Sequence, residues 1–132
     1  MSPIANMLIE LKNAQMVLKD HVMLPYSEFK FALANLLQEK GFVSNVEKKK
    51  RKGRKSDLNY IFIKLKYSDN VGMIKDVKLI SKPSRRVYKT KQELGKVLNG
   101  FGLSLVSTSS GLMTGEDASK KGVGGELICE IY

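Results

Sequence analysis

The sequence predicts an α+β protein of two small α/β lobes, in which N-terminal helices pack on a short sheet and the C-terminal lobe is mostly β with a short helix. Three observations carry this prediction. Apolar residues from Ile4 to Leu11 recur at helical spacing. Those from Ile61 to Tyr67 alternate with period two, as in a strand with one buried face. Beyond residue 80, short apolar runs separated by Gly- and Ser-rich turns indicate several strands and little helix.

Two helices and a short strand are expected first. Ser2-Pro3 is a typical N-cap followed by a first helical residue, which places a helix at about 3–17. A strand over 22–24 comes next. Ser27 caps the second helix, and Gly41 ends it. The apolar stripe of this second helix consists of Phe29, Ala32, Leu33, Leu36 and Leu37.

A strand beginning at 42–46 and a return strand at 60–67 predict a β-hairpin. Between them, residues 48–55 contain seven Lys or Arg and no acidic residue, and we expect this segment to interrupt the strand as a basic tip. Such a tip can contact phosphate, or it can be a solvated loop that protects a sheet edge from aggregation. Its charge exceeds what edge protection requires, which favours phosphate contact by Lys48, Lys49, Lys50 and Arg51.

A turn at 81–84, which contains two serines and a proline, marks the boundary between the lobes. We place the first lobe at 1–80 and the second at 81–132. Val77 and Leu79 are expected to continue the first sheet up to that boundary.

The second lobe opens with a short basic strand over 85–89. Arg85 and Arg86 bring cations close to Tyr88. One aromatic ring among cations suits stacking on an unpaired base together with phosphate contact. Packing of Tyr88 into the sheet is the alternative.

Two short helices are expected in this lobe. Thr90 and Glu93 have the spacing of a capping box, which begins a helix that extends to about Leu98. Thr114 caps the other helix, which ends at Gly122.

The most distinctive stretch is a turn of four consecutive hydroxyl residues at the end of a strand over 103–106. Hydroxyls donate and accept hydrogen bonds, so they can bind neutral base edges and 2′-hydroxyls of RNA. They can equally bond the backbone of their own turn. The four residues are Ser107, Thr108, Ser109 and Ser110.

A Gly-rich turn at 122–125 precedes the last strand. This strand, over 126–132, is apolar on both faces, so we expect it to be central or covered. Gly124 and Gly125 allow close backbone approach to a partner, or they form a plain turn.

The chain of 132 residues carries 23 Lys and Arg against 13 Asp and Glu, a formal net charge of +10. This excess favours a polyanionic partner, with nucleic acid ahead of an anionic membrane surface. The charge is uneven, because residues 82–96 hold six Lys or Arg against Glu93 alone, whereas residues 97–132 have a balance of −2. The hydroxyl turn is therefore not basic, and any contact it makes with nucleic acid uses neutral hydrogen bonds.

Several functional classes lack the residues they need. His21 is the only histidine and no Cys-x-x-Cys pair occurs, so no metal site is expected. Phosphate-binding loops, dinucleotide fingerprints and nucleophile motifs are missing, so we expect no cofactor, no small-molecule substrate and no enzyme. The one cysteine, Cys129, lies in an apolar run, which fits a core position and a reducing cytoplasm. Neither a spanning helix nor a signal peptide is indicated, so no membrane partner is expected.

The order of short motifs from Ile80 onwards is highly specific. It runs Ile-Ser-Lys-Pro, Arg-Val-Tyr, Lys-Val-Leu-Asn-Gly-Phe-Gly, Val-Ser-Thr-Ser-x-Gly-x-Met-Thr and Gly-Gly-Glu-Leu-Ile-Cys. Pro3-Ile4-Ala5 near the N-terminus, with Asn13 and Ala14, agrees with the same pattern. Over essentially its whole length the chain resembles the bacterial type of small-subunit ribosomal protein eight, a member of the universal S8 family.

The resemblance implies a structural protein that binds an irregular stem in the central domain of small-subunit ribosomal RNA and supports assembly and translation. The hydroxyl residues would hydrogen-bond bases and sugars, and Tyr88 would lie against the RNA. Cations of the first lobe would hold neighbouring phosphates. It also implies neighbouring small-subunit proteins five and twelve as partners and a cytoplasmic location in the ribosome. The remaining candidate RNA-binding residues are Asn13, Arg85, Arg86, Gly124, Gly125 and Glu126.

Two departures from the family pattern stand out. Ser2 replaces an aspartate that many relatives have, and both residues cap a helix. Residues 115–119 lack the arginine that ends the usual charged run, so its phosphate contact is not carried over, and Lys120 is the nearest substitute. A free-standing nucleic-acid-binding module is the competing functional interpretation.

Overall fold

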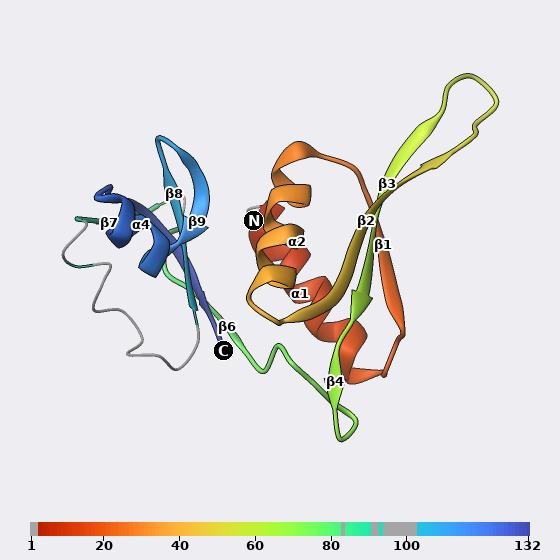
Figure 1. Ribbon diagram of the computed structural model, residues 1–132, viewed down its shortest axis with the longest axis horizontal. Helices are drawn as coiled ribbons and strands as arrows, with labels where there is room; N and C mark the ends of the chain where they lie inside the picture. Colours follow the sequence, from red (N-terminus) through yellow and green to blue (C-terminus); the bar gives the residue numbers. More distant parts are fainter. Residues whose placement is uncertain (1–2, 83, 91–92, 94–102) are drawn as a thin grey trace. The chain divides into compact units, whose positions relative to one another are not determined.

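The structure is a computed structural model that describes residues 3–82, 84–90, 93 and 103–132 (Figure 1). The chain divides into two compact units, Met1–Ile74 and Lys75–Tyr132. The first contains α1 (Pro3–Met16), β1 (His21–Pro25), α2 (Glu28–Glu39), β2 (Val43–Arg51), β3 (Leu58–Leu65), β4 (Tyr67–Ser68) and β5 (Val71–Gly72). The second contains β6 (Val77–Leu79), β7 (Tyr88–Lys89), β8 (Leu103–Thr108), β9 (Gly111–Thr114), α4 (Gly115–Lys121) and β10 (Gly125–Ile131). The predicted α+β class is confirmed.

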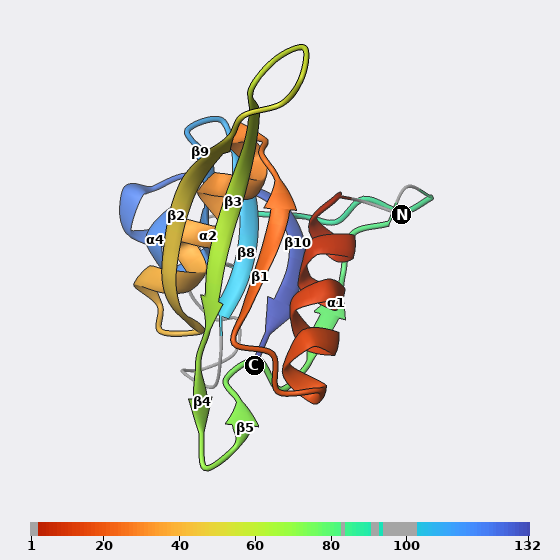
Figure 2. The same cartoon turned by 90° about the vertical axis from the view of Figure 1, so that its right-hand side faces the viewer.

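In the first unit, α1 and α2 lie on one face of an antiparallel sheet with the strand order β1-β3-β2 (Figure 2). Ile61, Ile63 and Leu65 of β3 are buried, as the period-two pattern predicted. Apolar burial of this kind stabilises a fold by about 25 cal/mol per Å² of surface removed from water. The helices supply the other half of the core through Met7, Leu8, Leu11, Leu33 and Leu37.

The ends of α2 follow the sequence prediction, but its buried face is turned. Ser27 Oγ accepts a hydrogen bond from the Lys30 N–H at 3.1 Å, and Gly41 adopts a left-handed φ of +84°. Phe29 and Ala32 are exposed, so their assignment to the apolar stripe was wrong. The buried residues of this helix are Leu33, Ala34, Leu36 and Leu37.

A buried glutamine ties the segment after β5 to α1. Gln15 Nε2 donates to the Ile74 carbonyl at 2.8 Å, and Gln15 Oε1 accepts from the Ile74 N–H at 3.1 Å. The glutamine amide thus replaces the partner strand that the Ile74 backbone lacks here. A Cβ added to Gly72 would lie 2.4 Å from Gln15 Cδ, so glycine is required where the segment passes this side chain.

In the second unit, β10 is the central strand. It pairs with β8 on one side, and with β6 and β7 on the other, as its two apolar faces predicted. The expectation that Val77 and Leu79 continue the first sheet was wrong, because β6 pairs with β10 over Val77–Leu79. A strand of three residues is too short for its apolar pattern to indicate which of the two sheets it joins. The apolar core beneath β8 and β10 contains Val106, Met113, Ala118 and Leu127.

Local capping signals in the second unit are confirmed. Thr114 Oγ1 accepts from the Asp117 N–H at 3.1 Å at the start of α4, and Gly122 ends this helix with a φ of +73°. Thr90 and Glu93 form the predicted capping box, with Thr90 N–H donating to Glu93 Oε1 at 3.2 Å. These contacts lower the pKa of the Glu93 carboxyl. The helix expected to continue to Leu98, and the Ser2 cap, lie outside the described residues.

Cys129 on β10 is fully buried. Replacing it with serine should lower the free energy of unfolding by about 1 kcal/mol or more, because the new hydroxyl would lie in an apolar environment. Burial, and to a lesser extent the Glu130 carboxylate, raise the pKa of the Cys129 thiol from 9.0 to about 12. Above pH 9.0 the unfolded chain therefore releases this proton while the folded chain keeps it, so stability should fall as pH rises towards 12. Chemical denaturation measures both effects. Rapid labelling of the native thiol, with no loss of stability in Cys129→Ser, would contradict the core position.

Candidate nucleic-acid interface

Three candidate residues from three strands form one row across the second sheet. Glu126 on β10 is paired with Tyr88 on β7 and with Ser107 on β8. Directly opposed residues of antiparallel strands point to the same face, so the Tyr88 ring, the Glu126 carboxylate and the Ser107 hydroxyl share a face. Tyr88 is 69% exposed. Its ring therefore does not pack into the sheet and is available for stacking.

An ion pair and a hydrogen bond from a backbone N–H to a serine hydroxyl fix the chain beside Tyr88. Arg86 Nη1 donates to Glu126 Oε2 at 3.1 Å, and the Glu126 side chain is only 18% exposed. The N–H of Val87 donates to Ser81 Oγ at 2.9 Å. An ion pair that is half exposed adds little stability. Its effect here is to neutralise the acid of the row and to fix the Arg86 side chain on Glu126.

The hydroxyl turn (residues 107–110) closes the β8–β9 hairpin, and its four hydroxyls are of two kinds. Thr108 Oγ1 donates to the Gly111 carbonyl at 2.8 Å and accepts from the Ser110 N–H at 3.1 Å. Thr108 thus has the local role that the sequence left open. The three serines are exposed. Their hydroxyls take part in none of the side-chain hydrogen bonds found among the described residues, so they can bond a partner.

Gly125 brings β10 unusually close to the backbone of β8. A Cβ added to Gly125 would lie 2.3 Å from the Ser107 carbonyl oxygen and 3.0 Å from Val106 Cγ1. Real Cβ atoms do not approach a backbone oxygen so closely. Within the protein, Gly125 therefore lets the backbones of β10 and β8 approach closely at Ser107. Gly124 beside it is exposed.

The basic hairpin (residues 48–57) is more ordered than the sequence predicted. β2 continues from Lys48 to Arg51 and pairs with β3 as far as Leu58, so the expectation that the cations interrupt the strand was wrong. Successive side chains of a strand point to opposite faces, which separates neighbouring cations. Lys52, Arg54 and Lys55 occupy the loop that follows.

The three lysines of β2 each have a partner that offsets their mutual repulsion within the strand. Lys48 Nζ lies 4.3 Å from the ring centroid of Tyr26, and Lys49 Nζ lies 4.2 Å from that of Phe62. Such cation–π contacts are worth about 0.5–1 kcal/mol at exposed sites. Lys50 Nζ lies 3.0 Å from a carboxylate oxygen of Asp57. The aromatic residues were visible in the sequence, but their register opposite the lysines was not.

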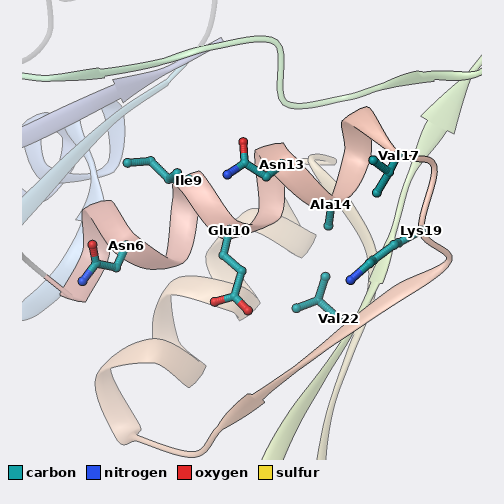
Figure 3. Close-up of a pocket in the computed structure, with 8 residues that line it drawn as sticks. All are labelled: Asn6, Ile9, Glu10, Asn13, Ala14, Val17, Lys19 and Val22. Atoms are coloured by element: carbon teal, nitrogen blue, oxygen red, sulfur yellow. The ribbon is translucent and has the colours of Figure 1, made fainter.

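Two predicted RNA-binding residues, Arg85 and Asn13, lie outside both the row of Tyr88, Glu126 and Ser107 and the basic hairpin. Arg85 is exposed and exchanges two backbone hydrogen bonds of 2.9 Å with Lys82, which closes a tight turn before Arg86. Asn13 is exposed on α1, beside a hollow of about 360 Å³ between α1 and β1 (Figure 3). The hollow is lined by Asn6, Ile9, Glu10, Asn13, Ala14, Val17, Lys19 and Val22.

Two other features are missing from the part of the chain that the structure describes. Within it, no helix has the length and apolar character needed to cross a membrane. Nor do three or more His, Cys, Asp or Glu side chains gather there in an arrangement that could hold a metal ion.

Comparison with known proteins gives one consistent result. The protein-family model described as Ribosomal protein S8 matches residues 2–132. The chain is 44% identical over 130 residues to the small ribosomal subunit protein uS8 of Ruthia magnifica, covering 98% of this chain and 96% of that protein. It is 42% identical over 130 residues to the uS8 protein of Dictyoglomus thermophilum and 42% identical over 131 residues to that of Koribacter versatilis, with the same coverage.

Proposed function

The chain belongs to the ribosomal protein S8 family, and we propose that it binds small-subunit ribosomal RNA as a structural protein of the small ribosomal subunit. The hydroxyl turn and Tyr88 bind an irregular stem of the RNA central domain and so support assembly. The family consists of ribosomal proteins and is not enzymatic. Neighbouring subunit proteins belong to the same proposal, with small-subunit proteins five and twelve as the predicted partners.

The observation that carries the proposal is the common face of Tyr88, Glu126 and Ser107. It places a ring that can stack on a base beside a hydroxyl that can both donate and accept. Arg86 pairs with the acid of the row, which reduces its repulsion of phosphate. Duplex RNA hides base edges in a deep, narrow groove, so small neutral groups can distinguish sequence where pairing is irregular.

Footprinting on naked small-subunit ribosomal RNA tests this proposal. The unsubstituted protein should protect one compact stem of the central domain, including an irregular internal loop, at protein concentrations that leave other domains reactive. Protection spread over many unrelated helices would show phosphate-driven binding only and would contradict the proposed function.

Neutralising the strand cations of the basic hairpin should weaken RNA binding without changing which RNA is preferred. In the quadruple variant Lys48→Gln, Lys49→Gln, Lys50→Gln and Arg51→Gln, each lost phosphate contact should reduce the slope of log affinity against log salt by about 0.7–0.9 units. The physical reason is that fewer counterions are released from the RNA. Titrations at several salt concentrations measure the slope. An unchanged slope would mean that these cations face only solvent and their partners within the protein.

A further inference from the structure

The first sheet has a face that α1 and α2 do not cover (Figure 2). Rings and charged side chains from its three strands lie on that face. Phe62 on β3 is paired there with Met23 on β1 and Glu47 on β2. The His21 ring stacks on the Phe62 ring with centroids 4.8 Å apart and an angle of 29°. Lys49 Nζ lies 4.2 Å from the same ring centroid. His21 belongs to β1 and Lys49 to β2, so Phe62 stands between an imidazole and an ammonium group.

Further cations lie on the same face. Lys64 is two residues after Phe62 on β3, so its side chain points to the same face, and it is paired with His21. Tyr60 is two residues before Phe62 and is paired with Lys49. Arg51 follows Lys49 at the two-residue spacing that keeps side chains on one face. Lys49, Arg51 and Lys64 are all exposed.

Two acidic side chains near this face, Glu47 and Asp20, make only weak ion pairs with its basic residues. Glu47 Oε2 lies 3.9 Å from Lys49 Nζ, and Asp20 Oδ2 lies 3.4 Å from His21 Nδ1. Exposed pairs of this kind are weak and screened by salt, so a polyanion can compete for the cations. The centres of protein–protein interfaces, by contrast, are depleted in Lys. The chemistry of the face therefore complements nucleic acid better than protein.

We propose that this face binds unpaired nucleotides of ribosomal RNA, with a base stacked on the exposed side of His21 and phosphates bound by Lys49, Arg51 and Lys64. The inference rests on the proposed function in taking the RNA to be ribosomal. A flat sheet face with rings and cations suits single strands, because every base has a face that can stack and the backbone can follow the charges. It differs in chemistry from the hydroxyl turn, which offers neutral hydrogen bonds.

The test compares the affinity of the full-length protein for two RNAs, a short single-stranded oligonucleotide and the central-domain stem. His21→Ala should weaken oligonucleotide binding about fivefold or more, which corresponds to one lost stacking contact. Lys64→Gln should weaken it too and lower the salt slope by about 0.7 units. Lys78→Gln removes the same charge from an exposed position of β6 and is the matched control, with a smaller effect expected. All three positions are exposed, and thermal melting verifies that each variant folds.

Ultraviolet cross-linking of the oligonucleotide, read by mass spectrometry, should label peptides that contain His21 or Phe62. Cross-links that miss β1 and β3 would overturn the proposal, and so would equal losses in Lys64→Gln and Lys78→Gln. If a neighbouring protein, and no RNA, is cross-linked to this face in reconstituted subunits, the face is a protein interface and the proposal also fails. Binding of the stem should be unchanged in His21→Ala. Failure of the unsubstituted protein to bind the stem would instead contradict the proposed function alone.

Discussion

Replacing Gly125 with alanine should destabilise the second unit by about 3 kcal/mol and lower the affinity for the cognate ribosomal RNA by about tenfold or more. The new Cβ would lie 2.3 Å from the Ser107 carbonyl oxygen. A backbone oxygen cannot rotate away as a side chain can, so β10 or β8 must move. Either movement disturbs the row of Tyr88, Glu126 and Ser107, because Glu126 directly follows the substituted residue and pairs with both other members.

Gly122→Ala is the matched control for this variant. Gly122 has a left-handed φ of +73°, but an added Cβ would meet no atom within 4 Å. Its cost should be limited to the conformational strain of alanine, about 1–2 kcal/mol, with little change in RNA affinity. Thermal melting and RNA titration of both variants separate the two causes. Equal effects in both would show that the close approach of β10 to β8 is unimportant.

Replacing Gln15 with leucine should lower the free energy of unfolding of the first unit by about 2–6 kcal/mol. Gln15 is buried and its amide bonds both the N–H and the carbonyl of Ile74. Leucine has a similar size but no polar atom, so two buried backbone groups would lose their partners at about 1–3 kcal/mol each. The effect should exceed that of the Cys129→Ser variant, where one polar group is added.

Chemical denaturation measures the stability of Gln15→Leu, and hydrogen exchange of the Ile74 amide locates the effect. Met16→Leu, at a neighbouring α1 position that is 75% exposed, should change stability by no more than about 0.5 kcal/mol. Unchanged protection of the Ile74 amide in Gln15→Leu would contradict the assigned role, since it would mean that another group replaces the glutamine amide.

Features with a local cause could be predicted from the sequence. The Ser27 and Thr114 caps, and the left-handed Gly41 and Gly122, depend on hydrogen bonds and backbone preferences within one turn. The alternation from Ile61 to Leu65 likewise reports burial directly. The serines of the hydroxyl turn were singled out for the same reason, because four adjacent hydroxyl residues are visible without any structure.

Features that depend on long-range pairing could not be predicted. The common face of Tyr88 and Ser107 exists because β10 pairs with both of their strands, and no local signal specifies that register. The continuation of β2 to Arg51 comes with its pairing to β3, and the rings that contact Lys48 and Lys49 belong to Tyr26 and Phe62, which are distant in the sequence. The division of roles within the hydroxyl turn, where Thr108 bonds its own hairpin, also required the geometry of the closed turn.

The most direct test of the central claim is the affinity of a Ser107→Ala, Ser109→Ala double variant for the central-domain stem and for an unrelated RNA of equal length, at several salt concentrations. Both serines are exposed and uncharged, and a double variant at the exposed Ser44 and Ser68 is the control. Loss of a contacted hydroxyl should cost about 1–3 kcal/mol, which is roughly tenfold in affinity for the stem. Affinity for the unrelated RNA and both salt slopes should stay unchanged, because phosphate contacts set them. Equal weakening on both RNAs, together with a lower melting temperature, would contradict the account and show that the serine hydroxyls stabilise the turn.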